Sequence, residues 1–184
     1  MRKVTLAIVT LAAVLIGSSD VFAQGKWGPD SAECIKYLSY YKEYYKQKAY
    51  DEATPNWRKA YELCPATASQ NMLIEGAALV RKLIVKNQNN PVYRDALVDT
   101  LLTLHDTRAQ YYPKYAITAL NNKGIDLANY VKNDYQKQFD GFEGIIENNK
   151  EETRANLLLF DLQAAINLYQ AGALDAETVI ATYQ

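Results

Sequence analysis

The feature that most constrains this chain is a run of small and aromatic residues at fixed spacing that ends at a proline. Ala53 and Ala60 are seven residues apart, with Trp57 between them, Tyr50 before them and Pro65 after them. Alanine at two positions on one helix face lets a second helix approach closely, and the large aromatic ring fills the space toward a further helix. Proline disfavours continuation of the helix. The run predicts an antiparallel helical hairpin, followed by others, because one hairpin cannot bury both of its faces.

These residues form the pattern Tyr-x2-Ala-x3-Trp-x2-Ala-x4-Pro, which resembles the second half of a tetratricopeptide repeat of about 34 residues. With Ala53 at repeat position 20, the preceding helix places Tyr37, Tyr40, Tyr41 and Tyr44 at positions 4, 7, 8 and 11. Positions 4, 7 and 11 are packing positions that accept large residues, but position 8 is normally small, so Tyr41 departs from the pattern. Two explanations are open: the first helix is displaced outward, or its register slips by one residue.

A second stretch near the C-terminus follows the same spacing. With Gly172 at repeat position 15, Ala164 and Ala165 occupy positions 7 and 8, and Leu168 occupies position 11. Glu177 at position 20 is the main departure. No polar capping helix follows this stretch, so we expect either further repeats or self-association at the last helix.

The segments between the two matches show weaker signals. A helix that starts at Pro113 is expected to break at Gly124, with Asp126 as the cap of the next helix. The stretch from Glu151 to Ala171 predicts a helix that is apolar nearly all round and therefore buried between its neighbours.

The N-terminal residues have the composition of a secretory signal peptide. Arg2 and Lys3 precede an apolar run from Leu6 to Ile16, and the segment from Val21 to Ala23 provides a small-x-small cleavage site. The apolar run is too short for a membrane-spanning helix, which needs about 20 apolar residues. We therefore expect an exported, soluble, periplasmic protein that reaches a membrane only through its partners.

The expected fold class is all-α, with antiparallel helical hairpins stacked as a right-handed tetratricopeptide-like superhelix. The expected organisation is a signal peptide at residues 1–23 and a repeat domain at 24–184, with a clear repeat at 34–67, a degenerate middle at 68–157 and a partial repeat at 158–184.

The two cysteines, Cys34 and Cys64, lie 30 residues apart and are symmetric about residue 49, where the first hairpin is expected to turn. Residues equidistant from the turn of an antiparallel hairpin lie side by side. A disulfide at its open end would suit an oxidising compartment. The alternative is a pair of small buried thiols.

Composition excludes several classes of function. The formal net charge is −1, which argues against nucleic-acid binding driven by bulk charge. His105 is the single histidine, whereas a zinc site needs three or four clustered ligands; it is interpreted as a surface imidazole or a hydrogen-bonded core imidazole. The chain contains no glycine-rich phosphate loop and no nucleophile-elbow motif. We therefore expect no metal, no cofactor and no catalytic residue.

The run from Cys34 to Pro65, including Trp57-Arg58-Lys59 and Cys64-Pro65, resembles exported tetratricopeptide-repeat proteins of Bacteroidota, most of which have no assigned function. The resemblance implies a scaffold for protein or peptide binding, in cell-envelope assembly or secretion. In such repeats the first helix lines a concave groove, and the corresponding residues here are Ile35, Leu38, Lys42, Tyr45 and Lys46.

Fifteen tyrosines, many of them in the first hairpin, serve either as packing residues or as a recognition surface. Two alternative functions are open. One is a structural oligomer formed through the terminal helix. The other is a hydrolase with carboxylate catalysis in the acidic C-terminal region, where residues 124–184 carry ten Asp or Glu against four Lys or Arg. The hydrolase would require two acids that converge in a pocket.

Overall fold

The computed structural model describes residues 25–183, and all of their regular structure is helical. The expected signal peptide, residues 1–23, lies outside the described residues. The helices are α1 (Ser31–Lys46), α2 (Tyr50–Leu63), α3 (Gln70–Lys86), α4 (Pro91–Tyr111), α5 (Ala116–Tyr130), α6 (Tyr135–Asn149), α7 (Ala155–Gln170) and α8 (Ala176–Tyr183).

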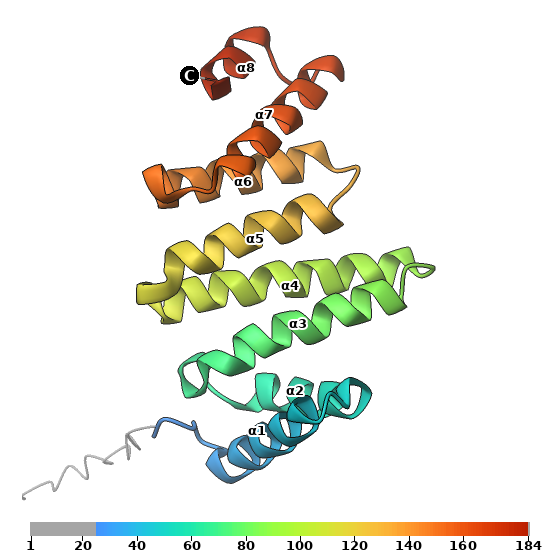
Figure 1. The fold of residues 1–184 in the computed structure, drawn as a ribbon, viewed down its shortest axis with the longest axis vertical. Coiled ribbons are helices and arrows are strands. Elements are labelled where there is room, and N and C mark those ends of the chain that lie inside the picture. The colour runs from blue at the N-terminus through green and yellow to red at the C-terminus, as the bar shows by residue number, and fades with distance from the viewer. Residues whose placement is uncertain (1–24, 184) are drawn as a thin grey trace, which may run out of the picture.

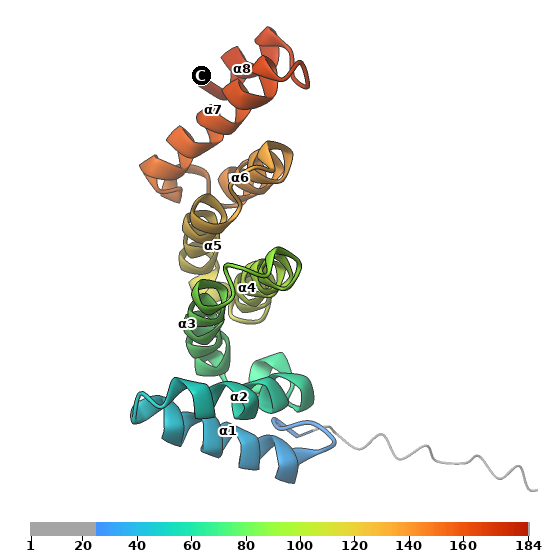
Figure 2. The same cartoon turned by 90° about the vertical axis from the view of Figure 1, so that its right-hand side faces the viewer.

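The helices stack in chain order along the long axis of the molecule, from α1 at one end to α8 at the other (Figure 1). Each helix packs mainly on the helices that precede and follow it in the chain, and α5 also contacts α7. Figure 2 shows α1 and α2 along their length while α3 to α5 are seen nearly end-on, so the first hairpin is turned relative to the middle helices. Within residues 25–183, none of the helices combines the length and the apolar character needed to cross a membrane.

The buried face of α1 differs by one residue from the repeat register expected for it. Cys34, Leu38 and Tyr41 form the buried stripe, at spacings of four and three. Tyr40 and Tyr44, which were assigned to packing positions, are 51% and 38% exposed. Of the two explanations for the misfit at Tyr41, the structure supports the slipped register.

A disulfide accounts for this register. Cys34 in the first turn of α1 is bonded to Cys64, which directly follows α2, and their Cα atoms are 5.1 Å apart. The bond turns Cys34 toward α2. Leu38 and Tyr41, one and two turns further along the same face, must then also point into the hairpin. The open end of the hairpin is therefore covalently closed.

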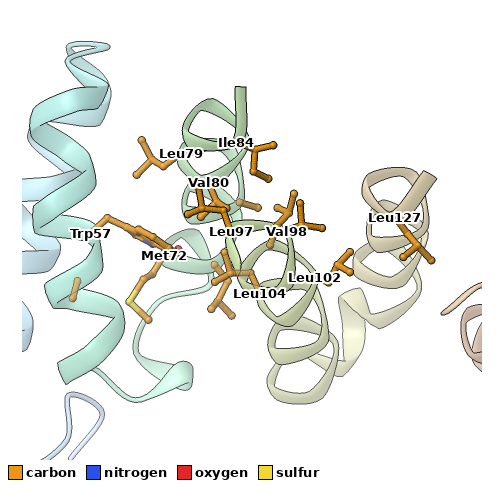
Figure 3. Close-up of a cluster of buried hydrophobic side chains, with 14 of the residues drawn as sticks. Trp57, Met72, Leu79, Val80, Ile84, Leu97, Val98, Leu102, Leu104 and Leu127 are labelled. Atoms are coloured by element: carbon orange, nitrogen blue, oxygen red, sulfur yellow. The ribbon is translucent and has the colours of Figure 1, made fainter. Parts of the chain in front are cut away.

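The contact between the first and second hairpins is built around Trp57. Ala53 and Ala60 are fully buried on α2, and Trp57 between them reaches toward α3 and α4. Figure 3 shows its indole directed toward Met72 and toward Leu97. The indole Nε1–H donates a hydrogen bond of 2.8 Å to the carbonyl oxygen of Met72, so its one polar atom is satisfied inside the core.

Helix α5 continues through Gly124, where the sequence predicted a break. A Cβ at this position would lie 2.6 Å from Leu157 Cδ1 and 3.3 Å from Ile145 Cδ1, so the missing side chain makes room for the neighbouring helices. Glycine within a helix costs about 1 kcal/mol relative to alanine, which close packing on both sides offsets. Asp126 is therefore an interior residue of α5 and not the cap of a new helix.

The expectation that α7 is buried all round is wrong. One face is buried and carries Leu157, Asp161, Ala164, Ala165 and Leu168. Leu159 on the opposite face is 67% exposed, and Leu158 and Phe160, on the two flanks of the buried face, are 46% and 39% exposed. The repeat positions assigned to Ala164, Ala165 and Leu168 thus coincide with buried positions. The neighbouring helices α5, α6 and α8 cover only that side of α7.

Candidate interaction surface

The five residues predicted to line a groove on α1 do not share one environment. Ile35 and Lys46 are exposed, and Lys42 is partly exposed. Leu38 is 4% exposed and lies in the core of the first hairpin, so it offers no side chain to a ligand. Its burial follows from the slipped register, because the groove positions were counted from the unslipped one.

Tyr45, the remaining predicted groove residue, is half-buried where α1 approaches α2 and α3. Its ring meets the ring of Tyr50 edge to face, with centroids 5.5 Å apart, and the ammonium of Lys82 lies 4.2 Å from the Tyr50 centroid. Burial raises the pKa of Tyr45, and the nearby Glu75 raises it further. Tyr45 is thus partly a packing residue, with one side available to solvent.

The structure brings together a charged cluster that the sequence did not predict. Arg81 on α3 donates two hydrogen bonds to Asp126 on α5, from Nε to Oδ1 at 2.8 Å and from Nη2 to Oδ2 at 2.7 Å. His105 on α4 donates from Nε2 to the same Oδ2 at 2.7 Å. Asp126 and His105 are buried, and Arg81 is half-buried.

Burial alone would raise the pKa of Asp126, but the hydrogen bonds from His105 and Arg81 outweigh it and lower that pKa. The cluster therefore joins three consecutive helices through one buried carboxylate. The sequence interpretation of His105 as a hydrogen-bonded core imidazole fits this position.

A second buried carboxyl belongs to Asp161 on α7, which is 2% exposed. Its Oδ1 has no hydrogen-bond partner among the described residues. Burial, and then the neighbouring carboxylate of Glu143 on α6, raise the pKa of Asp161 to about 7. The signal in the sequence was a single acid within an apolar stripe, one turn before Ala164 and Ala165.

Several clefts open on the described surface, and four of them bear on the candidate site. The largest of these four, about 780 Å³, lies between the α3–α4 turn and the α5–α6 turn and is lined by polar side chains that include Asn89, Asn129 and Asn133. A smaller one of about 310 Å³ lies between α2 and α4 and is mainly apolar, with Tyr61 and Tyr93 in its walls. The other two measure about 400 and 340 Å³.

None of these four clefts is lined by a residue of the predicted groove, and neither Glu143 nor Asp161 lines one. Among residues 25–183, no three His, Cys, Asp or Glu side chains lie close enough together to hold a metal ion.

The chain matches no protein-family model, no curated protein and no solved structure.

Proposed function

We propose that this chain is an exported, periplasmic scaffold of the tetratricopeptide type that binds a protein or peptide partner. Its hairpins would wind as a right-handed superhelix, and its role would lie in cell-envelope assembly or secretion. The bond between Cys34 and Cys64 supports an oxidising compartment, since disulfides persist outside the reducing cytosol.

The observation that carries the proposal is the burial of the repeat positions in two separate segments. Ala53, Trp57 and Ala60 are buried on α2, and Ala164 and Ala165 are buried on α7. Helices with small residues at their contacts pack closely and stack in chain order. Such a stack presents long faces to solvent instead of enclosing one compact core. Extended faces of this kind suit the binding of other chains.

Site-specific crosslinking in intact cells tests the proposal. A photoreactive amino acid replaces Ile35 or Lys46, which are exposed on α1, and Val85 on α3 provides an exposed control position. The proposal expects one protein to be captured from the α1 positions, identified by mass spectrometry, and to be absent from the Val85 control. No adduct above background at any exposed position of the stack would contradict the proposal, as would recovery of the protein in the cytosolic fraction.

A second candidate, a structural oligomer, is favoured by the exposed apolar face on α7 and α8. Leu158, Leu159 and Phe160 are exposed on α7 and Ile180 on α8. An apolar face of this kind favours association. Light scattering of the mature chain would then give a mass above that of a monomer, and Leu159→Glu together with Ile180→Glu would restore the monomer. A monomeric wild type rules out this candidate.

A further inference from the structure

The apolar cleft between α2 and α4 has the form of a preformed binding site. Trp57 and Tyr61 of α2 form one wall and Tyr93 of α4 forms part of the other, while Val80 and Leu97 lie between them. Both Val80 and Leu97 are buried. The volume of about 310 Å³ is at the low end of the roughly 300 to 1,000 Å³ of small-ligand pockets, which suits a single side chain better than a nucleotide.

The aromatic wall is held rigidly. Trp57 is fixed by its hydrogen bond to the carbonyl of Met72, and the ring of Tyr61 stacks on it with centroids 5.5 Å apart and an interplanar angle of 14°. A rigid wall loses little entropy when a ligand binds. Tyrosine and tryptophan at such positions contribute most to many protein interfaces.

A cation without a carboxylate partner lies at the mouth of the cleft. Arg58 donates from Nη2 to Tyr93 Oη at 2.6 Å, which bridges the two walls. Within residues 25–183, Arg58 forms no salt bridge, and Glu62, the acid that lines the cleft, pairs with Lys59 at 3.0 Å. The remaining guanidinium N–H groups of Arg58 are free to meet an acid on a ligand.

We infer that the α2–α4 cleft receives a partner peptide in which an aromatic or branched apolar side chain is followed by an acidic residue. The apolar side chain enters against Tyr61, Val80 and Leu97, and the acid pairs with Arg58. The inference rests on the proposed function and specifies the chemistry of the partner. It adds a contact on α2 and α4 to the one tested on α1, whose predicted groove residues lie outside this cleft.

Trp57 itself can report binding. The chain has two tryptophans, so Trp27→Phe leaves Trp57 as the single indole of the mature protein. The probe is an acetylated, amidated hexapeptide in which phenylalanine and then aspartate stand between flanking Gly-Ser pairs. Two matched peptides replace the phenylalanine with alanine or the aspartate with asparagine. We expect saturable quenching with the first peptide and at least about tenfold weaker binding with the alanine peptide.

The charge contact is tested by a double-mutant cycle. The asparagine peptide should bind the parent protein about fivefold more weakly than the aspartate peptide does. The two peptides should bind the Arg58→Gln variant with equal affinity. Arg58→Lys should recover part of the difference. A fivefold difference in affinity between the two peptides that persists in Arg58→Gln would show that another residue binds the acid, and it would overturn the assignment.

Occupancy of the cleft is tested by filling it. Ala96, an exposed residue of α4 that lines the cleft, accepts a larger side chain without disturbing the core. Ala96→Trp should therefore abolish peptide binding in a titration followed by calorimetry. Val85→Trp, at an exposed position outside the cleft, should leave binding unchanged. Unimpaired binding to Ala96→Trp, or no binding by the parent, overturns the inference.

Two further outcomes separate this inference from the proposed function. In the first, the crosslinker at Ile35 captures the same partner whether or not the protein also carries Ala96→Trp. The scaffold function then stands and the cleft assignment fails. If the parent protein is a dimer that Ala96→Trp dissociates while no peptide binds, the occupant is a second copy, and the peptide assignment fails.

Discussion

Gly76 on α3 lies against the indole of Trp57 on α2, so closely that a Cβ at residue 76 would stand 2.4 Å from Nε1. The two residues are complementary: the absent side chain on α3 provides the space that the largest side chain of α2 fills. This contact joins the first hairpin to the rest of the stack, and it also positions one wall of the α2–α4 cleft.

Gly76→Ala should therefore destabilise the protein, although alanine is the better helix former. Overpacking of a core costs about 1 to 3 kcal/mol, and the crowding atoms belong to a rigid ring held by a hydrogen bond. Gly144 on α6 is the matched control, since a Cβ there would meet nothing within 4 Å. Gly144→Ala should stabilise by about 0.5 to 1 kcal/mol. Urea unfolding measures both changes, and equal stabilisation by the two variants would contradict the close contact.

Reduction of the Cys34–Cys64 bond should lower stability. The bond closes a loop across 30 residues of sequence, and loss of such a constraint on the unfolded chain corresponds to about 3 to 4 kcal/mol. Thermal unfolding with and without reductant should show a lower Tm for the reduced protein. In the Cys34→Ala, Cys64→Ala double variant, reductant should have no effect. An unchanged Tm on reduction of the wild type would show that the bond contributes little.

Asp126→Asn should be strongly destabilising, because the neutral amide removes the ion pair with Arg81 and places an N–H donor where one of the two oxygens accepts from Arg81 or His105. Loss of one partner from a buried ion pair costs about 3 to 5 kcal/mol, and we expect the lower end since Arg81 is half-buried. Asp106→Asn serves as the control, because Asp106 directly follows His105 in the chain but lies in an exposed ion pair with Lys123. That pair should contribute about 0 to 1 kcal/mol to the free energy of unfolding. Chemical denaturation at pH 7 should separate the two variants clearly.

The lowered pKa of Asp126 also sets a pH dependence. Stabilisation by this carboxylate is fully present above the pKa of an unfolded aspartate, about 3.9, and is lost as the pH falls through the lower folded value. The acid limb of the stability curve should therefore be shallower in Asp126→Asn than in the wild type. Identical acid limbs would show that the carboxylate is not held ionised by its partners.

Asp161 should produce the opposite pH dependence. Its folded pKa is raised to about 7, above the value of about 3.9 in the unfolded chain. The folded state then binds more protons than the unfolded state between these values, so stability falls as the pH rises from about 4 to 7. Asp161→Asn, which is uncharged at every pH, should remove this fall and unfold at higher urea concentration than the wild type at pH 8.

Glu143→Gln provides the internal control for the same experiment. Because burial is the larger cause of the raised pKa and the Glu143 charge the second, the fall in stability should remain in this variant but end at a lower pH. A wild-type stability that is flat between pH 4 and 8 would contradict the burial of an acid at residue 161.

The local pattern was sufficient to predict the helical class and the packing residues of α2. Ala53, Trp57 and Ala60 repeat at helical spacing, and all three are buried. The symmetric spacing of Cys34 and Cys64 about the turn placed them side by side, because the geometry of an antiparallel hairpin depends on distance from the turn alone. Such features involve residues close in sequence, and backbone periodicity determines them.

Tertiary structure decided the features that depend on distant partners. The register of α1 follows from a covalent bond to the end of α2, and Gly124 lies inside a helix because α7 packs on it. Aspartate is a common helix cap, and the sequence predicted that role for Asp126. In the structure, Asp126 instead accepts hydrogen bonds from Arg81, 45 residues away in the chain, at the centre of a buried cluster. A side chain's burial and charge state depend on which helices surround it, so the sequence alone predicted neither this cluster nor the apolar cleft between α2 and α4.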